Sequence, residues 1–135
     1  MVSVRAEGRV YGTTVTSFAS VSADPPLVVI SLGPGAQVLP FLDEGRRFVV
    51  NVLSADQGRV ATVFADPYPV GPSPFAREGD PVLPGTQASL VCSVERVVPV
   101  GRGARLVLGL VEEALEGGRE QPPLLHYQRG YGVAP

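Results

Sequence analysis

Residues 10–22, VYGTTVTSFASVS, alternate between two sets of side chains at a period of two, which predicts β structure. We interpret them as one long or bent strand. The turn-forming triplet Asp24-Pro25-Pro26 follows, and residues 27–32, LVVISL, are then mainly apolar and largely β-branched. A run of this kind predicts a central strand that is covered on both faces.

Residues 47–53, RFVVNVL, repeat this apolar character and predict a further strand. Asn51 interrupts the run and is the single asparagine of the chain. A polar side chain in such a position costs free energy unless it is hydrogen-bonded, so Asn51 requires a partner.

Two short helices are expected beside these strands. Ser54 and Gln57 have the spacing of a capping box, and apolar residues follow at helical spacing, which predicts a helix to about Ala65. Residues 36–44, AQVLPFLDE, predict a second short helix, which Pro40 limits to a first turn or a kink.

The rest of the chain adds more strands around one long loop. Residues 66–86 are rich in proline and glycine and predict an ordered surface loop. Residues 87–98 and 104–115 predict an antiparallel pair, and residues 124–127 a last short strand. About six strands with one or two short helices indicate a mainly β fold, and a closed barrel is favoured over a sandwich because it leaves fewer unpaired edges.

Composition limits the chain to one globular domain over residues 1–135, with 44% apolar residues, 18% charged residues and a net charge of −2. The sequence contains no stretch long and apolar enough for a membrane span and no apolar signal segment, so we expect a cytoplasmic protein that is not bound to a membrane. A sequence pI near 5.3 with scattered arginines argues against a nucleic-acid partner.

Composition also excludes several kinds of chemistry. The chain has no lysine, which excludes Schiff-base enzymes and the phosphate-binding P-loop. Cys92 and His126 are single residues of their kinds, too few for a zinc site, and we predict no metal. A nucleophile elbow is absent, and His126 in its apolar run is more typical of a packed strand residue than of a base, so no catalytic residue is assigned.

Small hydroxyl side chains are concentrated around Phe18, at positions 13, 14, 16, 17, 20 and 22. Hydroxyls and strand-end amides suit a polar ligand with a flat ring and a hydroxylated tail, because each of them donates or accepts hydrogen bonds without carrying charge. The alternative is a threonine-rich strand face with ordinary β propensity.

Four blocks of sequence carry a resemblance to a known family. They are GTTVTSFASVSADPPLVVISL, RRFVVNVLSADQGRVATVFA, DPVLPGTQASLVCSVERVVPVG and PPLLHYQRGYG, and their order and spacing are similar to those of the flavin reductase-like family of FMN-binding split barrels. The resemblance covers most of the chain.

The resemblance implies a six-stranded Greek-key split barrel that binds FMN, with FAD as an alternative, near the interface of a homodimer. It further implies an NAD(P)H:flavin oxidoreductase that takes hydride from NADH or NADPH and supplies reduced flavin to a partner monooxygenase. Some members of the family instead keep the flavin as an electron carrier. The candidate flavin-binding residues are Thr14, Val15, Thr16, Ser17, Ser20, Ser31, Asn51, Val52, Leu53, Gln57 and Tyr131.

The chain departs from the family pattern in three places. Gly33 to Val38 lack the hydroxyls that commonly hold the flavin phosphate, so we expect the amides of Gly33 and Gly35 to form an anion-binding nest, with Arg46, Arg47 or Arg59 supplying charge. Arg102-Gly103-Ala104 replaces the family's Gly-Asp-His segment, which favours the electron carrier. Relatives usually begin with an extra segment, so the domain is expected to be short at its N-terminus. A barrel that has lost its cofactor and acts as an interaction module is the third hypothesis.

Overall fold

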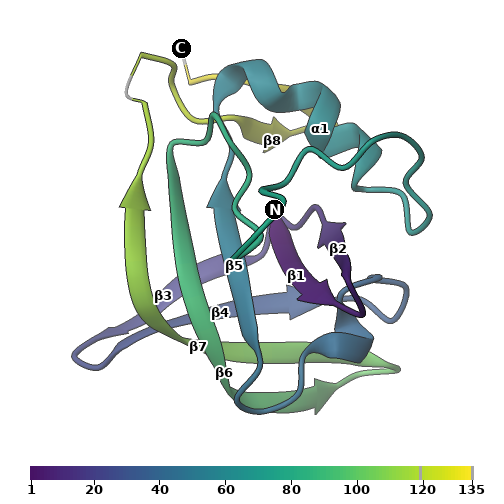
Figure 1. Ribbon diagram of the computed structural model, residues 1–135, viewed down its shortest axis with the longest axis vertical. Helices are drawn as coiled ribbons and strands as arrows, with labels where there is room; N and C mark the ends of the chain where they lie inside the picture. Colours follow the sequence, from purple (N-terminus) through teal and green to yellow (C-terminus); the bar gives the residue numbers. More distant parts are fainter. Residues whose placement is uncertain (119, 135) are drawn as a thin grey trace.

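The computed structural model describes residues 1–118 and 120–134 and consists mainly of antiparallel strands (Figure 1). Its elements are β1 (Val2–Ala6), β2 (Arg9–Thr13), β3 (Phe18–Ala23), β4 (Pro26–Leu32), the 3-10 helix η1 (Leu39–Phe41), β5 (Arg47–Val52), the 3-10 helix η2 (Ala55–Gln57), α1 (Gly58–Val63), β6 (Ala88–Val100), β7 (Ala104–Glu116), β8 (Leu125–Tyr127) and β9 (Gly130–Gly132).

Seven of the strands form one sheet in the order β2-β1-β5-β6-β7-β4-β3, and every neighbouring pair is antiparallel. The two edge strands, β2 and β3, are consecutive in the chain and are joined by residues 14–17 alone. So short a connection keeps the two edges close together, and the sheet curls around its core (Figure 1). The predicted mainly β barrel is confirmed, with seven strands in place of six, and β8 and β9 form a separate hairpin.

Residues 10–22 do not form the single strand that we expected. The backbone amide of Thr14 donates to Phe64 O at 2.9 Å, and its hydroxyl donates to Ala61 O at 2.7 Å. These bonds draw the chain away from the sheet toward the end of α1, so β2 ends at Thr13 and β3 begins at Phe18. The period of two in residues 10–22 continues through the break, because it depends only on the order of side chains in the sequence. It does not indicate a contact with a distant helix.

The apolar core lies on the inner face of the curled sheet, where Val4, Ile30, Phe48 and Val107 are buried. In β4 the buried positions alternate, with Val28, Ile30 and Leu32 inside and the intervening residues half-buried. The expectation that β4 is covered on both faces is therefore wrong in this chain. β4 is an inner strand between β7 and β3, but no second layer lies over its outer face within residues 1–118 and 120–134.

Gly109 in β7 leaves space for the Phe48 ring, and a Cβ at this position would lie 2.5 Å from Phe48 Cζ. We expect Gly109→Ala to lower the free energy of unfolding by about 1–3 kcal/mol, because Phe48 is fully buried and its ring has no room to move. Chemical denaturation measures this loss. Adding Phe48→Leu removes the closest ring atoms, so the double variant should lose less stability than the sum of the single ones, and strict additivity would contradict the proposed clash.

The two predicted helices have different outcomes. The backbone amide of Ser54 donates to Gln57 Oε1 at 2.9 Å, and η2 and α1 continue from this point to Val63, close to the predicted end. Residues 36–44 form only η1, because Pro40 lies inside it and cannot donate the hydrogen bonds of a longer helix. None of the helices in the described part of the chain is long and apolar enough to cross a membrane.

The predicted strand pair and loop are confirmed. β6 and β7 match residues 87–98 and 104–115 within a few positions, and residues 66–86 contain no helix or strand. The loop is attached to the sheet by Arg47, which donates to the Asp80 carboxylate at 3.0 and 3.1 Å and also to Glu112. The hydrogen bond from Arg47 holds the pKa of the Asp80 carboxyl below its usual value.

Cys92 is a buried core residue in β6, as its place in an apolar strand suggests. Burial raises the pKa of its thiol to about 12, and the charge of Glu112 acts in the same direction. The reactive thiolate is therefore scarce at neutral pH, and we expect no reaction of the folded protein with Ellman's reagent and complete reaction after unfolding in guanidinium. Rapid labelling of the folded protein would contradict this placement of Cys92.

Candidate functional site

A hollow of about 330 Å³ opens where the chain leaves the sheet between β2 and β3. The break at residues 14–16 forms one wall, the end of β5 forms the floor, and α1 and the β8–β9 hairpin contribute the rest. Figure 1 shows α1 and β8 together at this end of the molecule. The lining residues are Met1, Thr14, Val15, Thr16, Phe18, Val50, Asn51, Val52, Leu53, Ala61, Leu124, Leu125, His126 and Tyr131.

The two segments that the sequence singled out therefore converge on one hollow. Seven of the candidate residues line it, namely Thr14, Val15, Thr16, Asn51, Val52, Leu53 and Tyr131. The other candidates, Ser17, Ser20, Ser31 and Gln57, are not among its lining residues.

Free hydrogen-bond donors are concentrated at Val15 and Thr16. Thr14 uses both its amide and its hydroxyl to bind the end of α1. By contrast, within the described part of the chain the amides of Val15 and Thr16 and the Thr16 hydroxyl have no hydrogen-bond partner. Thr14 thus fixes the segment, and the next two residues present donors to whatever occupies the hollow.

The Asn51 side chain has hydrogen-bond partners within the protein, as expected for a polar residue that interrupts an apolar strand. Its Nδ2 donates to Ser3 Oγ at 2.9 Å, and its Oδ1 accepts from the Leu83 amide at 2.9 Å and from Ser89 Oγ at 3.0 Å. The residue is only 1% exposed. Its amide group therefore ties β1, the long loop and β6 to β5, and it leaves Val52 and Leu53 to form the floor of the hollow.

The four other candidates are used elsewhere or lie outside. Gln57 Nε2 donates to Pro84 O at 2.8 Å and Ser17 Oγ donates to Ser31 O at 2.9 Å, so these side chains stabilise the loop and the start of β3. Ser20 is exposed on β3 and Ser31 is half-buried on β4. Because sequence spacing does not show which face of a strand a hydroxyl occupies after a break, these residues could not be separated from the lining ones in advance.

On the aromatic side of the hollow, the sequence identified Tyr131 but not His126. His126 on β8 and Tyr131 on β9 have ring centroids 5.1 Å apart, and both rings line the hollow. The Leu124 amide donates to Leu53 O at 2.9 Å, which holds the hairpin over the end of β5. His126 lies on a strand as expected, but it is exposed at the hollow, where the β8–β9 register pairs it with Tyr131.

The backbone at Gly33 and Gly35 does not form the expected anion-binding nest, because neither residue has the positive φ angle that a nest requires. Gly33 and Gly35 line a neighbouring hollow of about 300 Å³ together with Thr13 and Asp66. The Thr13 hydroxyl is buried and has no partner among residues 1–118 and 120–134, which leaves a donor for a ligand.

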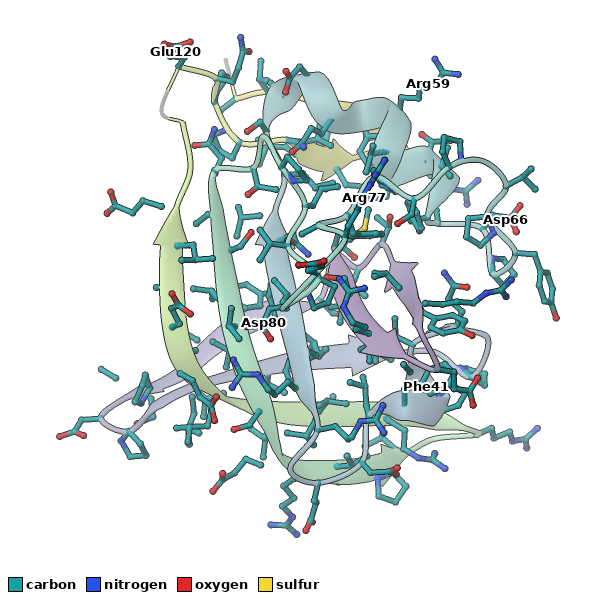
Figure 2. All side chains as sticks on the ribbon, viewed as in Figure 1. Phe41, Arg59, Asp66, Arg77, Asp80 and Glu120 are labelled. Atoms are coloured by element: carbon teal, nitrogen blue, oxygen red, sulfur yellow. The ribbon has the colours of Figure 1, made fainter. Side chains whose placement is uncertain are left out.

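The arginines expected to supply charge there do not reach it. Arg46, Arg47 and Arg59 line neither this hollow nor the one at residues 14–16. Arg47 is bound to Asp80 and Glu112, and Figure 2 shows Arg59 pointing outward from α1. The described residues that line this hollow therefore include one buried hydroxyl without a partner, and the Asp66 carboxylate is the only charged side chain among them.

Comparison with known proteins gives consistent matches. The sequence model of the flavin reductase like domain matches residues 1–135. The reductase component of 4-hydroxyphenylacetate 3-monooxygenase from Thermus thermophilus is 40% identical over 120 residues, which cover 89% of this chain and 76% of that protein.

Two solved structures extend the likeness to the fold. The styrene monooxygenase flavin reductase from Pseudomonas putida S12 matches with a TM-score of 0.84 and 34% identity, covering 99% of this chain and 88% of that one. The NADH:FAD oxidoreductase from Streptomyces globisporus, in complex with NAD and FAD fragments, matches with a TM-score of 0.82 and 29% identity, covering 99% and 82%.

Proposed function

Since this chain belongs to the flavin reductase-like domain family, we propose that it is an FMN-binding NAD(P)H:flavin oxidoreductase that supplies reduced flavin to a partner monooxygenase. The observation that carries the proposal is the convergence of residues 14–16 and residues 51–53 on one hollow. Two of the matched relatives are reductase components of monooxygenase systems, which supports the same kind of acceptor.

The hollow fits a flavin ring in size and in chemistry. Its volume of about 330 Å³ is in the range of small-molecule sites, its floor of Val52 and Leu53 is apolar, and the unpartnered amides of Val15 and Thr16 suit the ring carbonyls and nitrogens. The Thr16 hydroxyl suits the ribityl chain. For the phosphate we propose the hollow of Gly33 and Gly35, where the Thr13 hydroxyl is buried and has no partner among the described residues. The Asp66 carboxylate lines the same hollow and opposes the phosphate charge, so this part of the site binds less strongly than a cationic one would.

When bound, the flavin supplies the chemistry, since it accepts hydride from the nicotinamide and releases the electrons to an acceptor. The protein residues bind and orient the two rings and exclude water from the floor of the hollow. Hydride transfer between positioned rings requires no acid or base, so the residues that line the hollow act by positioning the rings.

A homodimer is part of the same proposal. The outer face of β4 is half-buried, and the adjacent edge strand β3 exposes Phe18 by 40% and Val21 by 53%. Apolar side chains that are exposed together on an edge strand suit burial against a second copy. Size-exclusion chromatography with light scattering should therefore give twice the mass of the chain, and a monomer would overturn this part of the proposal.

An anaerobic titration tests the proposed activity. FMN is added to the protein first, and its bound fraction is measured by quenching of its fluorescence. NADH or NADPH is then added without oxygen, and loss of the visible flavin absorbance at a rate proportional to protein supports the reductase.

Two other results favour the two other hypotheses. FMN that binds and keeps its absorbance with both nicotinamides indicates an electron carrier, which Ala104 in place of the family histidine favours. A chain that binds neither FMN nor FAD would contradict the proposal altogether and would indicate an interaction module.

A further inference from the structure

A third hollow of about 660 Å³ lies between the β1–β2 hairpin and the proline-rich loop. Three arginines line it, Arg5, Arg9 and Arg77, and none of its lining residues is acidic. The chain as a whole has a net charge of −2, so the positive charge of this hollow contrasts with the negative net charge of the protein. Such a site attracts anions more strongly than the rest of the molecule does.

Arg9 and Arg77 are exposed and available to an anion, whereas the charge of Arg5 also acts on the Asp80 carboxylate and helps to lower its pKa. Arg5 is held by the loop backbone, where its Nε donates to Gly79 O at 2.8 Å and its Nη2 donates to Ala76 O at 2.5 Å, so its charge is fixed in place. Arg9 and Arg77 have no ion pair within residues 1–118 and 120–134. Glu7 and Glu78 are near them in sequence but do not line the hollow.

The same hollow has apolar parts and a route to the flavin region. Pro69, Val70 and Pro72 line it, and Val70 is 91% exposed, so these side chains offer a surface for a flat base. Gln37 and Phe64 line both this hollow and that of Gly33 and Gly35. Gln37 is fixed by a 2.6 Å hydrogen bond to Gly12 O, so the two hollows are adjacent across an ordered side chain.

From this arrangement we propose that the hollow, defined as the arginine site, binds the adenosine phosphate moiety of a dinucleotide. Arg9 and Arg77 bind the phosphates through charge-assisted hydrogen bonds, and the fixed Arg5 charge adds to them. Two sources share this chemistry, FAD and the nicotinamide dinucleotide. The inference rests on the proposed function only for the choice between FAD and the nicotinamide dinucleotide, because binding of ADP alone tests the arginine site.

The test uses the whole chain and ADP as the probe. We expect ADP to bind in isothermal titration calorimetry at low salt, and Arg9→Gln/Arg77→Gln to weaken this binding about tenfold or more, because two charge-assisted hydrogen bonds are lost. Both side chains are exposed, so the variant should fold. The matched control is Arg46→Gln/Arg102→Gln, which removes the same charge at two exposed positions outside the arginine site and should leave ADP binding unchanged.

FMN and the dinucleotides then identify the source. ADP should bind without displacing FMN. If the arginine site holds the adenosine phosphate of FAD, Arg9→Gln/Arg77→Gln should lose affinity for FAD but not for FMN. If it holds that of the nicotinamide dinucleotide, the same variant should show a raised KM for NADH or NADPH. Failure to bind ADP, equal losses in the two double variants, or competition between ADP and FMN would overturn the arginine site. If the protein without substitutions does not bind FMN, the proposed function is overturned instead, so the two failures are distinguishable.

Discussion

Thr16→Trp is expected to weaken FMN binding about a hundredfold, corresponding to about 3 kcal/mol. Thr16 is exposed and lines the hollow of about 330 Å³, so an indole at this position fills space that the flavin ring requires. The substitution also removes the hydroxyl that has no partner in the described residues and is offered to the ligand. Fluorescence quenching of FMN by the protein gives the dissociation constant directly.

The matched control is Thr62→Trp, which adds the same side chain at an exposed hydroxyl position on α1, away from the proposed dimer face. Thr62 does not line the hollow, so FMN affinity should change by less than about threefold. Circular dichroism should show the same fold for both variants. Equal losses in the two variants, or a loss confined to Thr62→Trp, would contradict the proposed flavin site.

Asn51→Ala is expected to lower the free energy of unfolding by about 4 kcal/mol. The side chain is buried and binds Ser3 Oγ, the Leu83 amide and Ser89 Oγ, so its removal leaves a buried amide and two hydroxyls without these partners. The end of the long loop at Leu83 should then separate from β5. Urea denaturation followed by circular dichroism measures the loss.

Ser89→Ala provides the graded comparison, because it removes one donor to Asn51 and should cost about 1 kcal/mol. Where Asn51→Ala remains folded, FMN affinity should fall less than it does in Thr16→Trp, since the Asn51 amide group is directed at the protein and not at the ligand. A protein of unchanged stability that no longer binds FMN would show instead that Asn51 is a direct ligand.

The sequence predicted the parts of the fold that depend on local pattern. The period of two identified β6 and β7 within a few residues, and the Ser54–Gln57 spacing identified the start of the helical segment. It could not predict the break after Thr13, because the Phe64 and Ala61 carbonyls that divert the chain lie about fifty positions further on in the sequence.

The candidate site divides in the same way. Residues 14–16 and 51–53 could be predicted, because the resemblance to the family carried these segments and the hollow brings them together. The role of Asn51 could not, since its partners at positions 3, 83 and 89 come from three separate elements. Phe18, His126 and the arginine site became visible only through tertiary arrangement, because scattered arginines show no pattern until a loop and a hairpin bring them together.

The most direct test of the central claim follows backbone amide signals in two-dimensional nuclear magnetic resonance while FMN is added. We predict the largest shifts at Val15, Thr16 and Leu53, with smaller changes at Ala61 and His126, because these residues line the hollow at residues 14–16. Ser20 and the turn at Arg102 should be unaffected. Shifts absent from Val15, Thr16 and Leu53 and confined to another part of the surface would contradict a flavin held between these two segments.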